Sequence, residues 1–146
     1  MEDYLFDDKL PSVTMVDYNS IGTEITIKLL ELKNQIKIIH WQTTDYSEHK
    51  PLDKLFNILG VHIDKWVETF MGKYGRIVLS KKGEMLTLKN KKPGVDSTIS
   101  YLADSIKALR NLRDAFFSKS EDSDISSILD DIFADLNRTR YLLSLK

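Results

Sequence analysis

The sequence predicts an all-α fold, because apolar residues recur at three- and four-residue intervals through four long segments. Its 146 residues suit a single domain, residues 1–146, with a core that needs no covalent staples. The chain has no cysteine, so disulfides, thiol catalysis and cysteine-bound metal clusters are excluded. Four amphipathic helices of similar length indicate a four-helix bundle.

The first two helices follow residues that can cap a helix. We expect the first from Asn19 or Ser20 to about Thr43, and the second from Ser47 to about Lys73. Each carries an apolar stripe that is predicted to face the core. The stripe residues are Ile25, Leu29, Leu32, Ile36 and Ile39, then Leu52, Leu55, Leu59, Ile63, Trp66 and Phe70.

The other two helices lie in the second half of the chain. The third is expected after Asp96 or Ser97, and the fourth after a break in the pattern at residues 120–124. Residues 1–18 contain Pro11 and show no helical period, so we interpret them as an N-terminal arm.

The connection between the second and third helices is long enough to cross the whole bundle. In it, residues 77–79 and 85–88 are mostly apolar and flank Lys81, Lys82 and Gly83, a pattern that predicts a small β-hairpin. A single long crossover at this place is typical of ferritin-like bundles.

Charge and hydropathy restrict the partners and the location. The net charge of −1 provides no bulk attraction to nucleic acid or to membranes, so we expect DNA binding to be weak or absent. No apolar run approaches the roughly 20 residues that span a bilayer, which predicts no membrane association. Residues 1–9 are acidic and do not resemble a secretion signal. We therefore expect a cytoplasmic protein.

One line of polar residues on the second helix is a candidate metal site. His49 and Asp53 stand four positions apart, as do Asp64 and Glu68, and the interval between the two pairs is close to three helical turns. All four therefore share one face. Nitrogen and carboxylate oxygen without sulfur form a ligand set that suits iron, zinc or manganese.

The spacing of the two pairs predicts a site shared by two chains. Asp53 and Asp64 are about 16 Å apart along the helix, too far for one metal ion. The four positions are symmetric about residues 58–59, so two antiparallel copies would set His49 against the partner's Glu68 and Asp53 against the partner's Asp64. Gly60, near the proposed axis, is expected to permit a close approach.

The remaining histidines differ in their placement. His40 ends the first helix on its apolar stripe, where it can add a nitrogen ligand or be a satisfied core histidine. Trp41 follows it, and core packing is the alternative interpretation there. His62 points away from the line on the second helix, and we assign it no role.

These residues together resemble a known signature. The motifs are His40-Trp41-Gln42, His49-x3-Asp53 and Asp64-x3-Glu68. Over residues 36–72 they resemble the Dps proteins, or mini-ferritins, of the ferritin-like superfamily. The sequence is also similar to uncharacterised ferritin-like proteins of phages and other viruses, in which case its location would be the host cytoplasm or a virus particle.

The resemblance implies a ferritin-like four-helix bundle and an iron site between two-fold-related subunits. His40, His49 and Asp53 would come from one chain and Asp64 and Glu68 from its neighbour. Trp41 would lie beside one or two iron ions, for which zinc or manganese can substitute. The family forms two-fold dimers that assemble into hollow dodecamers.

Three functions stay open on the sequence alone. The first is a ferroxidase that oxidises Fe(II) and stores or detoxifies iron. The second is a non-catalytic structural or assembly protein, viral in one version, that retains the fold. The third is a DNA-compacting protein. Iron oxidation by the purified protein would separate the first from the second.

Overall fold

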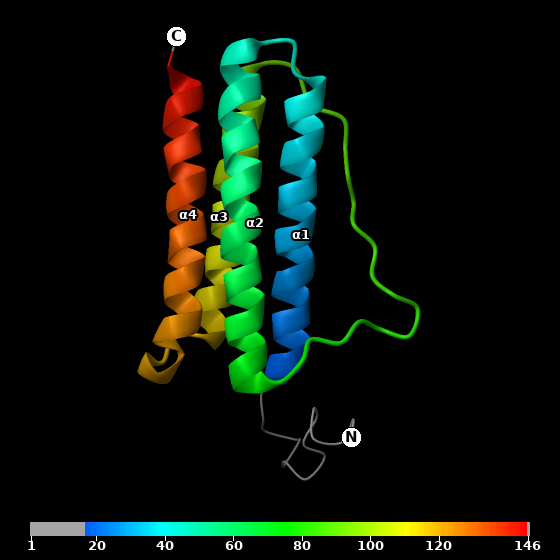
Figure 1. Ribbon diagram of the computed structural model, residues 1–146, viewed down its shortest axis with the longest axis vertical. Coiled ribbons are helices and arrows are strands. Elements are labelled where there is room, and N and C mark those ends of the chain that lie inside the picture. The colour runs from blue at the N-terminus through cyan, green and yellow to red at the C-terminus, as the bar shows by residue number, and fades with distance from the viewer. Residues whose placement is uncertain (1–16, 146) are drawn as a thin grey trace.

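The computed structural model describes residues 17–145, and within this range four long helices pack side by side as one bundle (Figure 1). The predicted all-α fold is therefore confirmed. The predicted N-terminal arm lies outside the described residues except for Asp17 and Tyr18. The helices are α1 (Tyr18–Gln42), α2 (Tyr46–Tyr74), α3 (Val95–Phe116) and α4 (Ser123–Ser144), with a short 3-10 helix η2 (Ser120–Asp122) before α4.

The core is formed by the predicted stripes. Every stripe residue of α1 and α2 named above is buried, and the rings of Trp66 and Phe70 stack with centroids 5.4 Å apart. Helix α2 packs against both α1 and α4, and α4 packs against α3. The caps lie earlier than predicted, because the carboxylates of Asp17 and Asp45 accept the first free backbone N–H groups, from Ser20 and Ser47.

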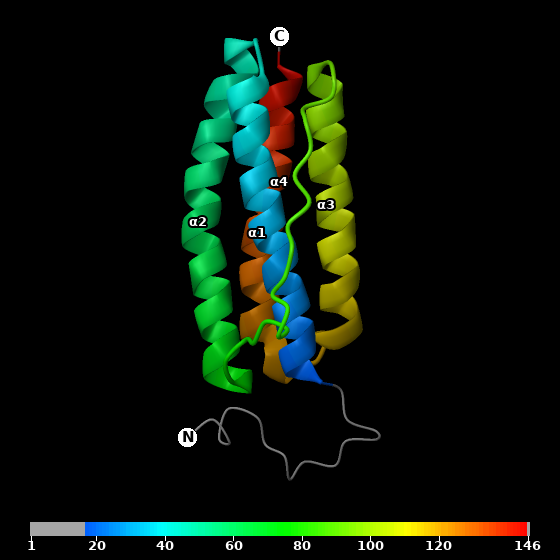
Figure 2. The same cartoon turned by 90° about the vertical axis from the view of Figure 1, so that its right-hand side faces the viewer.

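The crossover between α2 and α3 passes along α1 and α3 for the length of the bundle (Figure 2). The predicted β-hairpin is not found, since no strand occurs among residues 17–145; only its turn forms, where Gly83 N donates to Ser80 O at 2.8 Å. The backbone of the crossover forms hydrogen bonds with side chains of α1 instead of with a second strand. Gln35 exchanges two 2.8 Å hydrogen bonds with the backbone of Lys89, and Glu31 accepts from Thr87 N at 2.7 Å.

None of the helices in residues 17–145 is long and apolar enough to cross a membrane.

Gly22 of α1 leaves room for the ring of Phe70 on α2. A Cβ placed there would lie 2.1 Å from Phe70 Cζ, whereas a Cβ at Gly72 would meet nothing within 4 Å. We expect Gly22→Ala to lower the free energy of unfolding by about 1–3 kcal/mol through overpacking. The control Gly72→Ala should raise it by roughly 0.5–1 kcal/mol, since alanine is the better helix former. Urea unfolding measures both, and equal stability of Gly22→Ala and wild type would contradict this packing.

Candidate functional site

Two histidines meet at the corner where α1 ends and α2 begins. The short connection at residues 43–45 brings the imidazole rings of His40 and His49 face to face, with centroids 3.8 Å apart and an angle of 20° between the planes. His40 Nδ1 lies 2.7 Å from the carbonyl oxygen of His49, and His49 Nδ1 lies 2.9 Å from that of His40. A carbonyl oxygen only accepts, so each Nδ1 carries the proton and donates it. In the neutral rings both Nε2 atoms are then left with a free lone pair.

Asp53 completes this corner. It lies one turn after His49 on α2, and its Oδ1 is 3.8 Å from His40 Nε2. His40 is buried, whereas the side chain of Asp53 is half-exposed. The structure thus brings together three of the residues that the sequence suggests as ligands, His40, His49 and Asp53, from two helices.

Asp64 and Glu68 lie farther along α2 and are both exposed. Helical geometry separates Asp64 from Asp53 by about 16 Å, so one chain does not unite the two pairs. Within residues 17–145 no group of three or more His, Asp or Glu side chains is close enough to hold a metal ion by itself. At Gly60 a Cβ would lie 3.3 Å from Lys33 Nζ, the flexible end of a side chain of α1, and the expected close approach of a second chain there stays a prediction.

Lys37 is a site neighbour that the sequence interpretation missed. Its Nζ is 3.6 Å from Asp53 Oδ1, 4.4 Å from the centroid of the Phe56 ring and 5.6 Å from that of Trp41. The two rings attract the ammonium through their negative faces. Trp41 is 65% exposed, so it is not a core residue in this chain. Its position one turn before His40 on the same helix is the feature of the sequence that could have identified Lys37.

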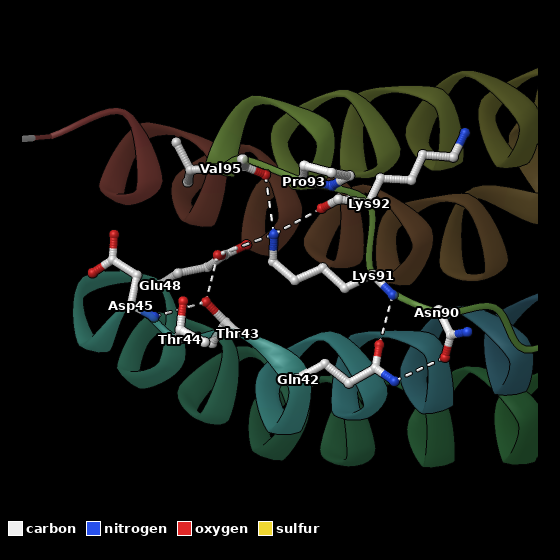
Figure 3. Close-up of a pocket in the computed structure, with 11 residues that line it drawn as sticks. Gln42, Thr43, Thr44, Asp45, Glu48, Asn90, Lys91, Lys92, Pro93 and Val95 are labelled. Carbon is white, nitrogen blue, oxygen red and sulfur yellow. Dashed lines mark hydrogen bonds and ion pairs between the residues drawn. The ribbon is translucent and has the colours of Figure 1, made fainter.

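A buried ion pair fixes the same end of the bundle (Figure 3). Glu48 is 2% exposed; its carboxylate accepts from the hydroxyls of Thr43, at 2.7 Å, and Thr98, and lies 3.5 Å from Lys91 Nζ. Lys91 also donates to the carbonyl of Gly94 at 3.0 Å. These bonds join the α1–α2 connection, the crossover and α3, and so they support the histidine corner. The signal in the sequence was a glutamate one turn before Leu52, on the apolar stripe of α2.

His62 lies on the other side of α2, as its position in the sequence predicts. Its Nδ1 is 2.5 Å from Asp135 Oδ2 of α4. Burial raises the pKa of the Asp135 carboxyl, and the hydrogen bond from His62 acts in the opposite direction. The pair links α2 to α4 and takes no part in the histidine corner.

Comparison with known proteins gives two matches. The model of a family described as a family of unknown function (DUF5856) matches residues 40–143. The chain is also 29% identical over 109 residues to an uncharacterised 14.6 kDa protein from the mobD–ri intergenic region of Enterobacteria phage T4, an alignment that covers 73% of this chain and 75% of that protein. No solved structure matches. Neither match is described as a Dps or ferritin-like protein.

Proposed function

The chain belongs to the DUF5856 family, whose function is unknown, and we propose that it binds and oxidises iron at a site shared by two copies of itself, on a ferritin-like bundle. The observation that carries the proposal is the crossed hydrogen bonding of His40 and His49. Each ring is held in the tautomer that leaves Nε2 free, which is how ligating histidines are usually prepared by their outer hydrogen bonds.

The ligand chemistry supports iron. Two imidazole nitrogens and the carboxylate of Asp53 are nitrogen and oxygen donors of the kind that Fe(II) takes, and zinc and manganese accept the same donors. Lys37 neutralises Asp53 when no metal is bound, and its ammonium would have to move aside for a cation. The single long crossover between α2 and α3 supports the ferritin-like topology.

The missing ligands would come from the second copy. Asp64 and Glu68 are exposed and lie on the same line of α2 as His49 and Asp53. An antiparallel pairing of two α2 helices would set the acidic end of each against the Lys37–His49 end of the other, which is complementary in charge. Val61, which is 66% exposed, would supply apolar contact near the two-fold axis.

Iron is the substrate of this reaction. Two Fe(II) ions would give up one electron each, and one hydrogen peroxide, with two protons, would accept the two electrons and leave as two water molecules. The protein would hold the Fe(II) ions through the imidazoles and carboxylates and leave positions open for the oxidant. Trp41 lies beside Lys37 at the edge of the site and is 65% exposed, so a docked second chain would be able to contact it.

An anaerobic titration tests the proposal. We expect saturable binding of Fe(II), or of Co(II) as its coloured substitute, and we expect His49→Ala to abolish it. The matched control is His62→Gln, which removes a histidine of the same helix that pairs with Asp135 and should leave metal binding unchanged. Peroxide and oxygen are then added in separate runs.

The outcomes are distinct. Fe(III) formation that depends on His49 supports the ferroxidase. Binding without oxidation contradicts it and favours a non-catalytic protein with a structural metal. Absence of saturable binding for Fe(II), Co(II) and Zn(II) overturns the metal site altogether.

A further inference from the structure

We propose that the groove between α3 and α4 binds an oxyanion of the phosphate type. This groove has a volume of about 220 Å³. It lies away from the α1–α2 corner and from the line of Asp64 and Glu68. Its polar lining comes from both helices and comprises Lys107, Arg110, Asn111, Asn137 and Arg140.

The charged residues that line the groove are all positive. Three cationic side chains line it, and none of the described lining residues is acidic. In the part of the chain that the structure describes, Lys107, Arg110 and Arg140 form no ion pair; the carboxylates farther along the groove, Asp114 and Asp130, are both bound by Arg113. The whole chain has a net charge of −1, so this concentration of unneutralised positive charge is local. Clefts lined by one sign of charge attract ions of the other sign.

The hydrogen-bond donors of the groove are largely unused. Arg140 donates one bond, from Nη1 to Asn137 Oδ1 at 2.9 Å, and its Nε is buried with no hydrogen-bond partner among residues 17–145. Buried donors are usually paired, so an unsatisfied one indicates a missing acceptor. Asn137 uses its oxygen in that bond and keeps its amide N–H groups free to donate.

The guanidinium group of Arg110 is positioned by packing and not by hydrogen bonds from its N–H groups. Its guanidinium carbon lies 5.1 Å from the centroid of the Phe133 ring, so packing against the ring orients it and its N–H groups remain available. Two oriented guanidinium groups and one ammonium match a compact dianion with several oxygens better than a single carboxylate. Phosphate has that charge and shape.

The phosphate could be free or part of a nucleotide. Tyr141 is not part of the groove lining, but it follows Arg140, lies one turn from Asn137 on α4 and is 62% exposed. A nucleobase attached to the bound phosphate could stack on the tyrosine ring. Inorganic phosphate and AMP therefore form separate arms of the test.

The experiment follows the arginine Nε–H resonances of the full chain by NMR during titration with inorganic phosphate, at an ionic strength held constant with chloride. We expect saturable shifts for Arg140 and Arg110. Arg140→Gln should weaken binding by about tenfold, the loss of one charge-assisted contact. Lys107→Gln, at an exposed position that leaves the fold intact, should weaken it by about threefold to tenfold.

The matched control is Arg138→Gln, since Arg138 is an exposed arginine of α4 that does not line the groove. It should leave binding unchanged. An equal loss in Arg138→Gln would show diffuse attraction and overturn the site, as would the absence of saturable shifts below about 50 mM phosphate. Tighter binding of AMP than of phosphate identifies a nucleotide as the source, and equal binding identifies free phosphate.

Discussion

Glu48→Ala is expected to lower the free energy of unfolding by about 3 kcal/mol, because it leaves the largely buried ammonium of Lys91 without its carboxylate. The hydroxyls of Thr43 and Thr98 lose their acceptor in the same substitution. The carbonyls that Lys91 retains keep the expected loss at the lower end of the range for broken buried pairs. Denaturant unfolding at neutral pH gives the value.

Two variants make this result specific to the ion pair. Glu24→Ala removes an exposed glutamate of α1 and should change the free energy of unfolding by less than about 0.5 kcal/mol. The double variant Glu48→Ala with Lys91→Ala should be more stable than the sum of the two single losses predicts, since both buried charges are gone. A loss in Glu48→Ala no larger than that in Glu24→Ala would mean that Glu48 is solvated in solution.

The local pattern of apolar residues was sufficient to predict the four helices and the faces that they bury. The stripes of α1 and α2 face the core because the 3.6-residue period determines which side chains share a face. The crossover could not be predicted in this way, because its two apolar runs are compatible with a hairpin in isolation. Its actual partners include Thr23, Glu31 and Gln35, which lie 54 to 56 residues away in the sequence.

The candidate site shows the same difference between features set by local spacing and features set by distant residues. The shared face of His49 and Asp53 follows from their spacing on one helix, but the stack of His40 on His49 depends on the path of residues 43–45. The spacing on α2 also does not indicate Lys33 of α1, whose Nζ would lie 3.3 Å from a Cβ at Gly60. Lys37 and Lys33 of α1 were thus the neighbours that the sequence did not predict, whereas His40 of the same helix was expected.

Iron binding should be restored when two inactive variants of this chain share one dimer. The first variant is His49→Ala with Asp53→Ala, and the second is Asp64→Ala with Glu68→Ala. Under the proposed two-fold arrangement each variant alone lacks every site. In a mixed dimer one site collects all four substitutions, whereas the other combines the intact pair of each chain.

Random reassembly after co-refolding makes about half of the dimers mixed, so about a quarter of all sites should recover. Fe(II) binding and oxidation are measured before and after mixing, and native mass spectrometry confirms that the chains have exchanged. Each variant co-refolded with itself is the control and should stay inactive. The four side chains are partly or fully exposed, so their truncation should leave the bundle folded. Confirmed exchange without recovery would contradict the shared site, because an intact set of ligands would then be present and yet bind no iron.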